Sequence, residues 1–436
     1  MIFDRITLPV NEIPKFWLNI LPSLPEPLPD PIPKIGEKPC REKVLKMFES
    51  SWTKEALWQE YAPVARVRVP DEVLEYYIRV GRPTPLYRAR RLEEYLRTPA
   101  RIYFKREDML PTGSFKLNTI IPQIYYAKKE GFEFIVSSTG AGQTGSAVAA
   151  VARAMGFKAK IFMVRSKYKS APLRGTFMKL CGAEFTPSPS PETEIGRKYY
   201  SVNPEHPGDL EICAKEAAEW AQKSKFKAYV VKGSFFNFVI LHQTIIGLEV
   251  KKQLETIDET PDVLIGCVGA GSNFLGLTLP FVHDVIKGKG NYKFIAVRSD
   301  VCAPEINGEY RYDLLAPDTE GPLYKMYTLG VTTEVPPIIA EGLRHHFSSP
   351  ILSYLVNKKI VKVVAYKEKE ALKAGALVMG LENFIPAAES SYAIKAAIDE
   401  ALKAKETGEE KVIVANISGN GFLDLAGYAQ VLGLEK

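Results

Sequence analysis

From Gly81 to the C-terminus, short apolar runs alternate with stretches of helical periodicity, and this alternation constrains the fold most strongly. Alternating strands and helices predict parallel sheets that are covered by helices. The chain of 436 residues is long enough for about two or three domains with large buried cores. The expected strands are 132–137, 159–164, 229–231, 263–268, 294–297 and 411–417, and the clearest helices are 145–155, 211–222 and 390–405.

Residues 1–80 differ from the rest of the chain and are predicted to form an irregular, Pro-rich N-terminal arm. Prolines crowd residues 21–33, which disfavours helix and favours extended chain. The arm also carries Trp17, Trp52 and Trp58, whereas a disordered tail would have few aromatic residues. We therefore expect the arm to pack on the body of the protein.

Charge and cysteine usage exclude several classes of function. The formal net charge of +6 is modest and the two signs are interspersed, so we expect no contact with nucleic acid or membrane. The five cysteines are scattered without a C-x-x-C pair, which argues against disulfides or a metal site and suits the cytoplasm. The uncharged run 263–282 has glycines at its centre, so a strand, a turn and a helix explain it better than a membrane span.

Three glycine-rich loops follow predicted strands, where parallel α/β sheets bind their ligands. The first consists of Thr139, Gly140, Ala141, Gly142 and Gln143, and the second of Gly269, Ala270, Gly271, Ser272 and Asn273. Backbone N–H groups and the positive end of a following helix suit a carboxylate at the first loop and a phosphate at the second. In the third loop, the hydroxyl of Ser418 can bond a ring nitrogen. Ordinary connectors or a helix N-cap are the alternative for each loop taken alone.

Lys116 lies in residues 111–118 (PTGSFKLN), directly after a tight Thr-Gly-Ser turn. Its neighbours Phe115 and Leu117 are apolar, which favours the neutral amine that attacks an aldehyde. Most lysines are solvated surface charges, and that is the alternative here. The segment looks like the Schiff-base lysine of a pyridoxal-phosphate (PLP) enzyme, in which the cofactor carries the difficult chemistry.

Seven segments occur in the order seen in tryptophan synthase β chains, and the chain resembles that family from about residue 15 to the C-terminus. The segments are 81–86 (GRPTPL), 112–116 (TGSFK), 139–143 (TGAGQ), 242–247 (HQTIIG), 269–273 (GAGSN), 385–390 (IPAAES) and 418–421 (SGNG). The arm, with WLNILP at 17–22, is similar to the second, largely archaeal subgroup.

The resemblance implies an α/β, fold-type-II PLP enzyme with two three-layer α/β/α domains, mostly parallel twisted sheets and the cofactor between them. The implied parts are the arm over residues 1–80, an N-terminal α/β domain over 81–230 with a mobile substrate-closing subdomain, and a C-terminal PLP-binding α/β domain over 231–436. It also implies a homodimer that acts on an amino-acid donor and indole. Association with an α subunit stays open.

The resemblance also assigns roles to residues. The implied cofactor-binding residues are Lys116, Asn118, residues 269–273, Glu382 and Ser418, and residues 139–143 would cradle the amino-acid carboxylate. Arg344 stands where the ordinary family has an aspartate that holds the hydroxyl of serine, and the second subgroup, associated with O-phospho-L-serine, has arginine. A guanidinium binds phosphate with two parallel hydrogen bonds, whereas an aspartate repels it. We therefore expect O-phospho-L-serine in preference to L-serine, with helix capping or a surface ion pair as the alternative role of Arg344.

Ser138 stands where the family carries a catalytic glutamate, directly before residues 139–143. A serine hydroxyl is no general base near neutral pH without a partner. We predict a PLP-dependent β-replacement lyase that joins phosphoserine to indole, in which Lys116, Arg344 and Ser138 are the catalytic candidates. The alternatives are a sulfur nucleophile, β-elimination (deamination) of phosphoserine, or a non-catalytic partner subunit.

Overall fold

The computed structural model describes residues 4–317 and 321–434 and divides into two compact units. Unit 1 comprises Met1–Val44, Gln59–Pro111 and Ser234–Lys436, and unit 2 comprises Leu45–Trp58 and Thr112–Gly233. This division differs from the expected one, because residues 81–111 add two strands to the sheet of unit 1. The boundary expected after residue 230 lies close to the one observed after Gly233.

A seven-stranded sheet forms the centre of unit 1, in the order β1-β4-β5-β15-β10-β11-β14. The strands from β5 to β14 in this order are parallel, whereas β4 pairs with both β1 and β5 in antiparallel fashion. The strands are β1 (Arg5–Ile6), β4 (Leu86–Arg88), β5 (Arg101–Arg106), β10 (Val263–Cys267), β11 (Lys293–Ser299), β14 (Val361–Tyr366) and β15 (Val412–Ile417). Every residue of β10 and β15 is buried, which explains their continuous apolar sequences.

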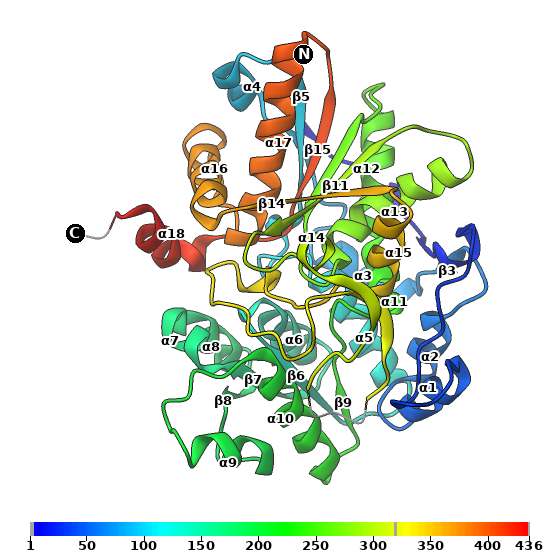
Figure 1. Ribbon diagram of the computed structural model, residues 1–436, viewed down its shortest axis with the longest axis vertical. Coiled ribbons are helices and arrows are strands. Elements are labelled where there is room, and N and C mark those ends of the chain that lie inside the picture. The colour runs from blue at the N-terminus through cyan, green and yellow to red at the C-terminus, as the bar shows by residue number, and fades with distance from the viewer. Residues whose placement is uncertain (1–3, 318–320, 435–436) are drawn as a thin grey trace. The chain divides into compact units, whose positions relative to one another are not determined.

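Helices cover both faces of this sheet (Figure 1). On one face, Ile265 of β10 and Ile413 of β15 share a core with Ala397 of α17. On the other face, Gly266 meets Phe274 of α13. The helices of unit 1 are α3 (Asp71–Arg79), α4 (Arg90–Leu96), α11 (Asn237–Gln243), α12 (Ile245–Glu255), α13 (Ser272–Ile286), α14 (Pro304–Asn307), α15 (Pro350–Asn357), α16 (Glu368–Glu382), α17 (Ala388–Thr407) and α18 (Leu425–Leu432), with the 3-10 helices η1 (Val10–Glu12), η2 (Leu21–Ser23), η3 (Glu107–Met109), η4 (Glu341–Leu343) and η5 (Phe422–Asp424). The hairpin of β12 (Glu309–Asp313) and β13 (Tyr324–Thr328) stands outside the large sheet.

Unit 2 contains a four-stranded parallel sheet in the order β8-β7-β6-β9. Phe134 and Phe162 pack on one face against Cys213 of α10, whereas Ile161 faces Gly145 of α6 on the other. The strands are β6 (Phe134–Thr139), β7 (Lys158–Val164), β8 (Glu184–Ser188) and β9 (Ala228–Val230), and the helices are α5 (Leu117–Lys129), α6 (Gln143–Ala154), α7 (Arg165–Ser170), α8 (Pro172–Leu180), α9 (Glu194–Tyr200) and α10 (Leu210–Lys223). The prediction of α/β layers around mostly parallel sheets is confirmed.

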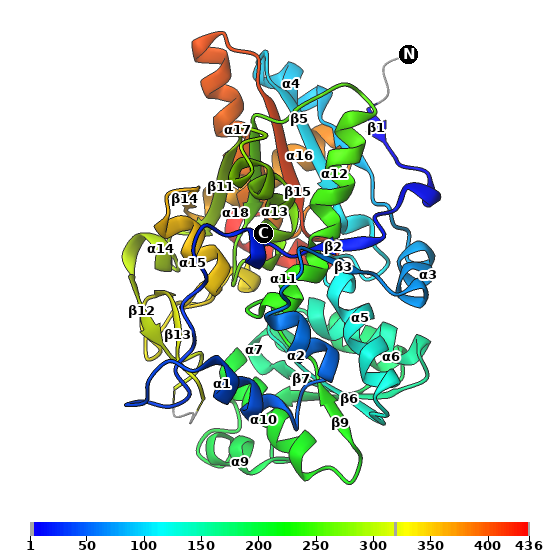
Figure 2. The same ribbon diagram turned by 90° about the vertical axis from the view of Figure 1, so that its right-hand side faces the viewer.

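The N-terminal segment is more regular than expected. It forms α1 (Arg41–Phe48), α2 (Lys54–Glu60) and α3, and β2 (Phe16–Leu18) pairs with β3 (Arg66–Arg68). β2 and β3 lie beside α11 and α12 (Figure 2), where the Leu18 N–H donates to Thr244 Oγ1 at 2.9 Å. Trp17 is fully buried with its ring 4.5 Å from that of His242, so β2 of the arm packs on α11 within unit 1.

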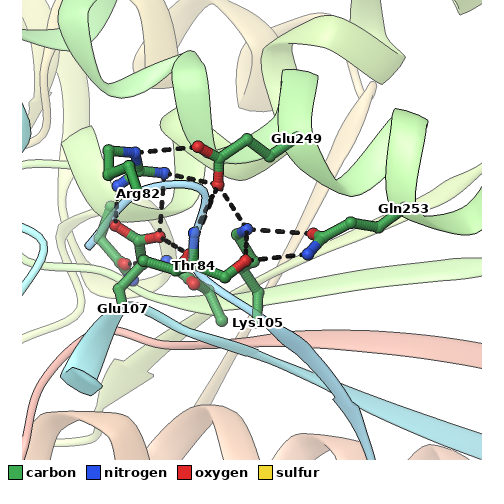
Figure 3. Close-up of polar contacts among 8 residues, drawn as sticks. Arg82, Thr84, Lys105, Glu107, Glu249 and Gln253 are labelled. Atoms are coloured by element: carbon green, nitrogen blue, oxygen red, sulfur yellow. Dashed lines mark hydrogen bonds and ion pairs between the residues drawn. The ribbon is translucent and has the colours of Figure 1, made fainter. Parts of the chain in front are cut away.

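A cluster of buried charged side chains joins β5, η3 and α12 in unit 1 (Figure 3). Arg82 donates to Glu107 at 2.8 Å and to Glu249 at 2.9 Å. Lys105 donates to Glu249 at 2.6 Å and to Gln253 Oε1 at 3.0 Å. Burial opposes the charge of Glu107, but Arg82 and Lys105 outweigh it and hold the pKa of Glu107 below its ordinary value. We call Arg82, Thr84, Lys105, Glu107, Glu249 and Gln253 the buried ion cluster.

Candidate active site

The second glycine-rich loop joins β10 to α13 in unit 1. Gly271 has a φ of 123° and forms the N-cap of α13, and a Cβ at Gly269 would overlap the carbonyl oxygen of Gly342. Glycine is therefore required at both positions, whereas the buried residue between them tolerates the methyl group of Ala270. Within the described ranges, the buried hydroxyl of Ser272 has no hydrogen-bond partner. A helix N-terminus with an uncommitted hydroxyl fits a phosphate group.

Asn273 stabilises this loop from within. Its Nδ2 donates to Cys267 O at 3.0 Å, and its Oδ1 accepts from Asn416 Nδ2 at 2.6 Å. Both ends of the amide are therefore engaged inside the protein. The expected donation from the Asn273 side chain to a ligand stays a prediction, and Ser272 is the better-placed side-chain donor of the loop.

Ser418 follows β15, the strand that pairs with β10, so it lies at the same carboxyl edge of the sheet as the loop. Its Oγ lies 2.9 Å from Ser390 Oγ and 3.5 Å from Cys267 Sγ. The backbone N–H of Gly419 in turn donates to Ser390 Oγ at 3.2 Å. This network fixes a buried hydroxyl that is able to donate to a ring nitrogen.

The glutamates Glu382 and Glu389 contact different parts of unit 1. Glu382 accepts from the Leu92 N–H at 2.8 Å and from Tyr87 Oη at 3.4 Å, and burial raises its pKa. These contacts tie the end of α16 to residues 87–92, and the role of Glu382 at the cofactor ring stays a prediction. Glu389 contacts the loop region instead, because its Oε1 accepts from Gly342 N at 2.9 Å and Gly342 abuts Gly269. Sequence reasoning assigned Glu389 no role, although it lies in the segment IPAAES.

Arg344 follows η4, in the segment 341–349 that packs on the glycine loop. The backbone N–H of Ser349 in this segment donates to Ala270 O at 2.8 Å. The guanidinium of Arg344 donates to the carbonyl of Val335 through Nε at 2.8 Å, and also through Nη2. Its Nη1 lies 3.2 Å from Glu341 Oε1. The expected phosphate-binding arginine thus belongs to the loop region, and the Val335 carbonyl and the Glu341 carboxylate occupy its donors.

Lys116 lies in unit 2 as the N-cap of α5, half-buried, with its Nζ 4.5 Å from the ring centroid of Phe115. Asn118 is buried in the first turn of the same helix. In the turn before Lys116, the buried hydroxyls of Thr112 and Ser114 have no hydrogen-bond partner in the described part of the chain. A position over the face of an aromatic ring suits a charged ammonium, so the neutral amine expected from the apolar neighbours of Lys116 stays a prediction.

The first glycine-rich loop also lies in unit 2, between β6 and α6. The Gly142 N–H donates to Thr139 Oγ1 at 3.1 Å, and Gly142 has a φ of 92° because it turns the chain into α6. A Cβ at Gly142 would lie 2.6 Å from Cδ of the buried Arg174. The loop (Thr139, Gly140, Ala141, Gly142 and Gln143) offers the N-terminus of a 12-residue helix to a carboxylate. Ser138 is the half-buried penultimate residue of β6.

Comparisons with known proteins identify the family of the chain. Residues 78–419 match the family model described as "Pyridoxal-phosphate dependent enzyme". "Tryptophan synthase beta chain 2" of Pyrococcus furiosus is 48% identical over 428 residues, covering 98% of this chain and 95% of that protein. "Tryptophan synthase beta chain" of Thermococcus gammatolerans is 49% identical over 429 residues, covering 98% and 96%. The chain belongs to the tryptophan synthase β-chain family.

Solved structures share the fold of this family at low sequence identity. A fungal L-serine ammonia-lyase from Rhizomucor miehei superposes with a TM-score of 0.61 at 18% identity, covering 80% of this chain and 97% of that one. A hydrogen sulfide-producing enzyme from Fusobacterium nucleatum gives 0.56, also at 18% identity, covering 81% and 99%. At these identities the likeness shows the fold-type-II architecture alone.

Membership of the tryptophan synthase β-chain family makes this chain a PLP-dependent lyase, as predicted. The residues fit the cofactor, because the loop ends at the N-terminus of α13 and the buried hydroxyl of Ser272 has no hydrogen-bond partner among the described residues. Among the described residues, no group of three or more His, Cys, Asp or Glu side chains could hold a metal ion. In the same ranges, no helix is long and apolar enough to cross a bilayer.

Proposed function

We propose that this chain condenses O-phospho-L-serine with indole by β-replacement. The observation that carries the proposal is the position of Arg344 in the segment that packs on residues 269–273 through the contact of Gly342 with Gly269. Arginine binds a phosphate ester with charge-assisted hydrogen bonds, and it has no acceptor for the hydroxyl of serine. Phosphate also leaves more readily than hydroxide, so the donor needs less acid assistance.

The residues of the chain divide the remaining work. When bound, PLP supplies an electron sink for the α-carbon of the amino acid. Lys116 would hold PLP covalently and, once freed, take the α-proton with its amine. Residues 269–273 would hold the phosphate of PLP, and Ser418 would donate to its ring nitrogen. Residues 139–143 would bind the carboxylate of the donor at the N-terminus of α6.

Arg344 has to exchange partners in this scheme. Its donors now reach Val335 O and Glu341, and the arriving phosphate replaces the neutral carbonyl as the stronger acceptor. The segment that carries Val335 is held separately, because Glu368 Oε1 accepts from the N–H groups of Ile339 and Ala340 at 2.6 and 3.2 Å. The exchange therefore moves a side chain and leaves residues 339–340 anchored.

Steady-state kinetics with phosphoserine or L-serine and indole test the proposal. We expect wild type to prefer phosphoserine and Arg344→Asp to lose about a hundredfold or more in kcat/KM for phosphoserine while gaining on L-serine. Arg68→Asp makes the same charge change at an exposed pair with Asp71 and is expected to leave the preference intact. A wild type that makes tryptophan from L-serine as fast as from phosphoserine would contradict the choice of donor.

Ser138 supports a second candidate, in which the acceptor is a thiolate or water instead of indole. Indole needs a base to take its N–H proton, and a serine hydroxyl cannot serve near neutral pH, whereas a thiolate is already deprotonated. Phosphoserine turnover to pyruvate at equal rates with and without indole would favour β-elimination. Turnover that requires sulfide would favour a sulfur nucleophile. We place indole first because of the family to which the chain belongs.

A further inference from the structure

Ser349 is a buried serine that lies directly before α15. Its side chain is fully buried, and its Oγ has no hydrogen-bond partner in residues 4–317 and 321–434. Its two nearest serine neighbours differ. Ser348 Oγ accepts from Arg298 Nη2 at 2.6 Å, and Ser353 Oγ accepts from Tyr327 N at 2.9 Å. A buried hydroxyl without a partner costs about 1–3 kcal/mol, so its retention indicates a ligand.

The hydroxyl of Ser349 is directed at the glycine loop. The backbone N–H of Ser349 donates to Ala270 O at 2.8 Å, which fixes the residue against the loop. Its Oγ lies 3.1 Å from the position that a Cβ of Gly271 would occupy. The hydroxyl of Ser272, the residue after Gly271, is also buried without a partner in the described structure. Gly271 therefore lies next to two serines, Ser272 in sequence and Ser349 in space, whose buried hydroxyls have no partner among the described residues.

A second helix begins at the same place. Ser349 is the N-cap of α15, but its hydroxyl makes no capping hydrogen bond, and Pro350 at the first helical position has no N–H. A Cβ at Gly271 would lie 3.3 Å from Leu352 Cδ2, so the first turn of α15 adjoins the N-cap of α13. The N-termini of two helices thus meet at Gly271, and each contributes partial positive charge. This arrangement suits a tetrahedral dianion.

The charged groups around the loop are already paired. Arg298 donates to Val268 O at 3.2 Å, and its guanidinium is neutralised by Glu305 at 2.8 Å. The carboxylate of Glu389 accepts from the Gly342 N–H at 2.9 Å. Because Arg344 is assigned to the phosphate of the donor, the groups left to bind an anion at residues 269–273 are hydroxyls, backbone N–H groups and helix ends.

We propose that Ser349 is a further cofactor-binding residue, whose hydroxyl donates to the PLP phosphate together with Ser272 and the N-terminus of α15. The inference rests on the proposed placement of that phosphate at residues 269–273. It extends the site from one strand-to-helix loop, which ends in α13 at Ser272, to a second helix that begins at Pro350.

Cofactor binding to the apoprotein of the full chain tests this role without any assay of turnover. The variants are Ser349→Ala, Ser272→Ala and, as a matched control, Ser353→Ala, which removes a buried hydroxyl that already has a partner. The probes are PLP, pyridoxal without its phosphate, and inorganic phosphate as a competitor. The ³¹P resonance of bound PLP reports the surroundings of the phosphate directly.

We expect Ser349→Ala to weaken PLP binding about tenfold to a hundredfold, to shift the ³¹P resonance and to leave pyridoxal binding unchanged. Ser353→Ala should alter neither ligand. Weakened PLP binding in Ser272→Ala with wild-type binding in Ser349→Ala would overturn the role of Ser349 and keep the loop. Wild-type binding in both would refute the loop itself as the phosphate site. Equal weakening of PLP and pyridoxal in Ser349→Ala would show a structural defect and also overturn the role.

Discussion

Ser138 occupies the position at which the family is expected to carry a catalytic glutamate. It is the penultimate residue of β6, and the first glycine-rich loop begins at the next residue. A glutamate here would extend from a strand end that is already fixed by pairing with Phe162 of β7. The position is half-buried in the wild type. In the family that this chain resembles, it carries the group that assists the acceptor.

We predict that Ser138→Glu raises the rate of tryptophan formation from indole by about tenfold to a hundredfold or more, because a positioned general base contributes on that scale. The measurement is kcat with saturating phosphoserine, followed by tryptophan fluorescence. Ser138→Gln, equal in size but not basic, serves as the control and should give no gain. An equal gain in both variants would show that side-chain volume, and not proton transfer, limits the wild type.

Glu60 gives the chain a pH-dependent stability. Its carboxyl is buried, Phe238 N donates to its Oε2 at 3.1 Å, and burial raises its pKa from 4.5 to about 8. The folded state therefore holds this proton more tightly than the unfolded state does. The stabilisation is complete below about pH 4.5 and is lost as pH rises toward 8.

We predict that Glu60→Gln flattens this dependence, so that the variant gains on wild type between pH 5.5 and 7.5 by up to about 1.4 kcal/mol per pH unit. Urea unfolding at the two pH values measures the difference. Glu75→Gln, on the exposed side of α3, should run parallel to wild type. Parallel profiles for Glu60→Gln as well would contradict a protonated Glu60.

The candidate site could be predicted from sequence to the extent that it consists of contiguous loops. Motifs located Lys116, residues 139–143, residues 269–273 and Ser418, because each carries its own glycine or serine signal. Ser349 and Glu389 were missed, since each reaches residues 269–271 only through tertiary contacts. The hydrogen bond between the side chains of Asn273 and Asn416 could not be predicted either, because the two residues are distant in sequence.

At the scale of elements, two glycines allow α13 to pack closely against α11 and α12. A Cβ at Gly247 would overlap the carbonyl oxygen of Leu277, and one at Gly276 would lie 2.7 Å from the carbonyl oxygen of Gln243. These contacts involve backbone atoms, which cannot turn aside as a flexible side chain can. The helix that starts at the proposed phosphate site is thereby fixed in position along its length.

We predict that Gly247→Ala lowers the free energy of unfolding by about 1–3 kcal/mol or more through overpacking. Gly380→Ala on α16 is the matched control, because a Cβ there meets nothing within 4 Å. That control should raise stability by about 0.4–1 kcal/mol, since alanine restricts the unfolded chain. Denaturant unfolding measures both variants, and a neutral Gly247→Ala would contradict the close contact.

Helices and strands with a strong hydrophobic pattern were predicted well. Short strands that form only through pairing with neighbouring strands were not. The expected strand 263–268 is β10 at Val263–Cys267, and the expected helix 211–222 is α10 at Leu210–Lys223. β4 is only three residues long and owes its conformation to its neighbours β1 and β5. The helices at 41–79 were missed because the prolines of 21–33 favoured an irregular arm throughout. Within 21–33 itself the structure contains one short 3-10 helix, η2 at Leu21–Ser23.

For the whole molecule, cofactor removal should be visible as a loss of stability. PLP binds the folded chain through groups that the unfolded chain does not bring together, so binding shifts the unfolding equilibrium. We predict that PLP at a hundredfold excess over its Kd stabilises the apoprotein by about 2.7 kcal/mol. Thermal melts with and without PLP measure the shift.

The same experiment on Lys116→Ala separates the covalent bond from the other contacts. The variant should retain a smaller stabilisation, which the phosphate and ring contacts supply, and should not be labelled by borohydride at residue 116. A full wild-type stabilisation together with wild-type turnover would refute the role of Lys116. A colourless wild type that borohydride cannot label would instead indicate a chain without catalytic function.

The buried ion cluster makes part of this fold indifferent to ionic strength. Arg82, Lys105, Glu107 and Glu249 are inaccessible to solvent and their formal charges cancel, so dissolved ions neither reach nor screen them. Exposed pairs such as that of Arg68 with Asp71 are screened by added salt. The connection that the cluster makes between β5, η3 and α12 is therefore equally strong in dilute buffer and in a concentrated brine.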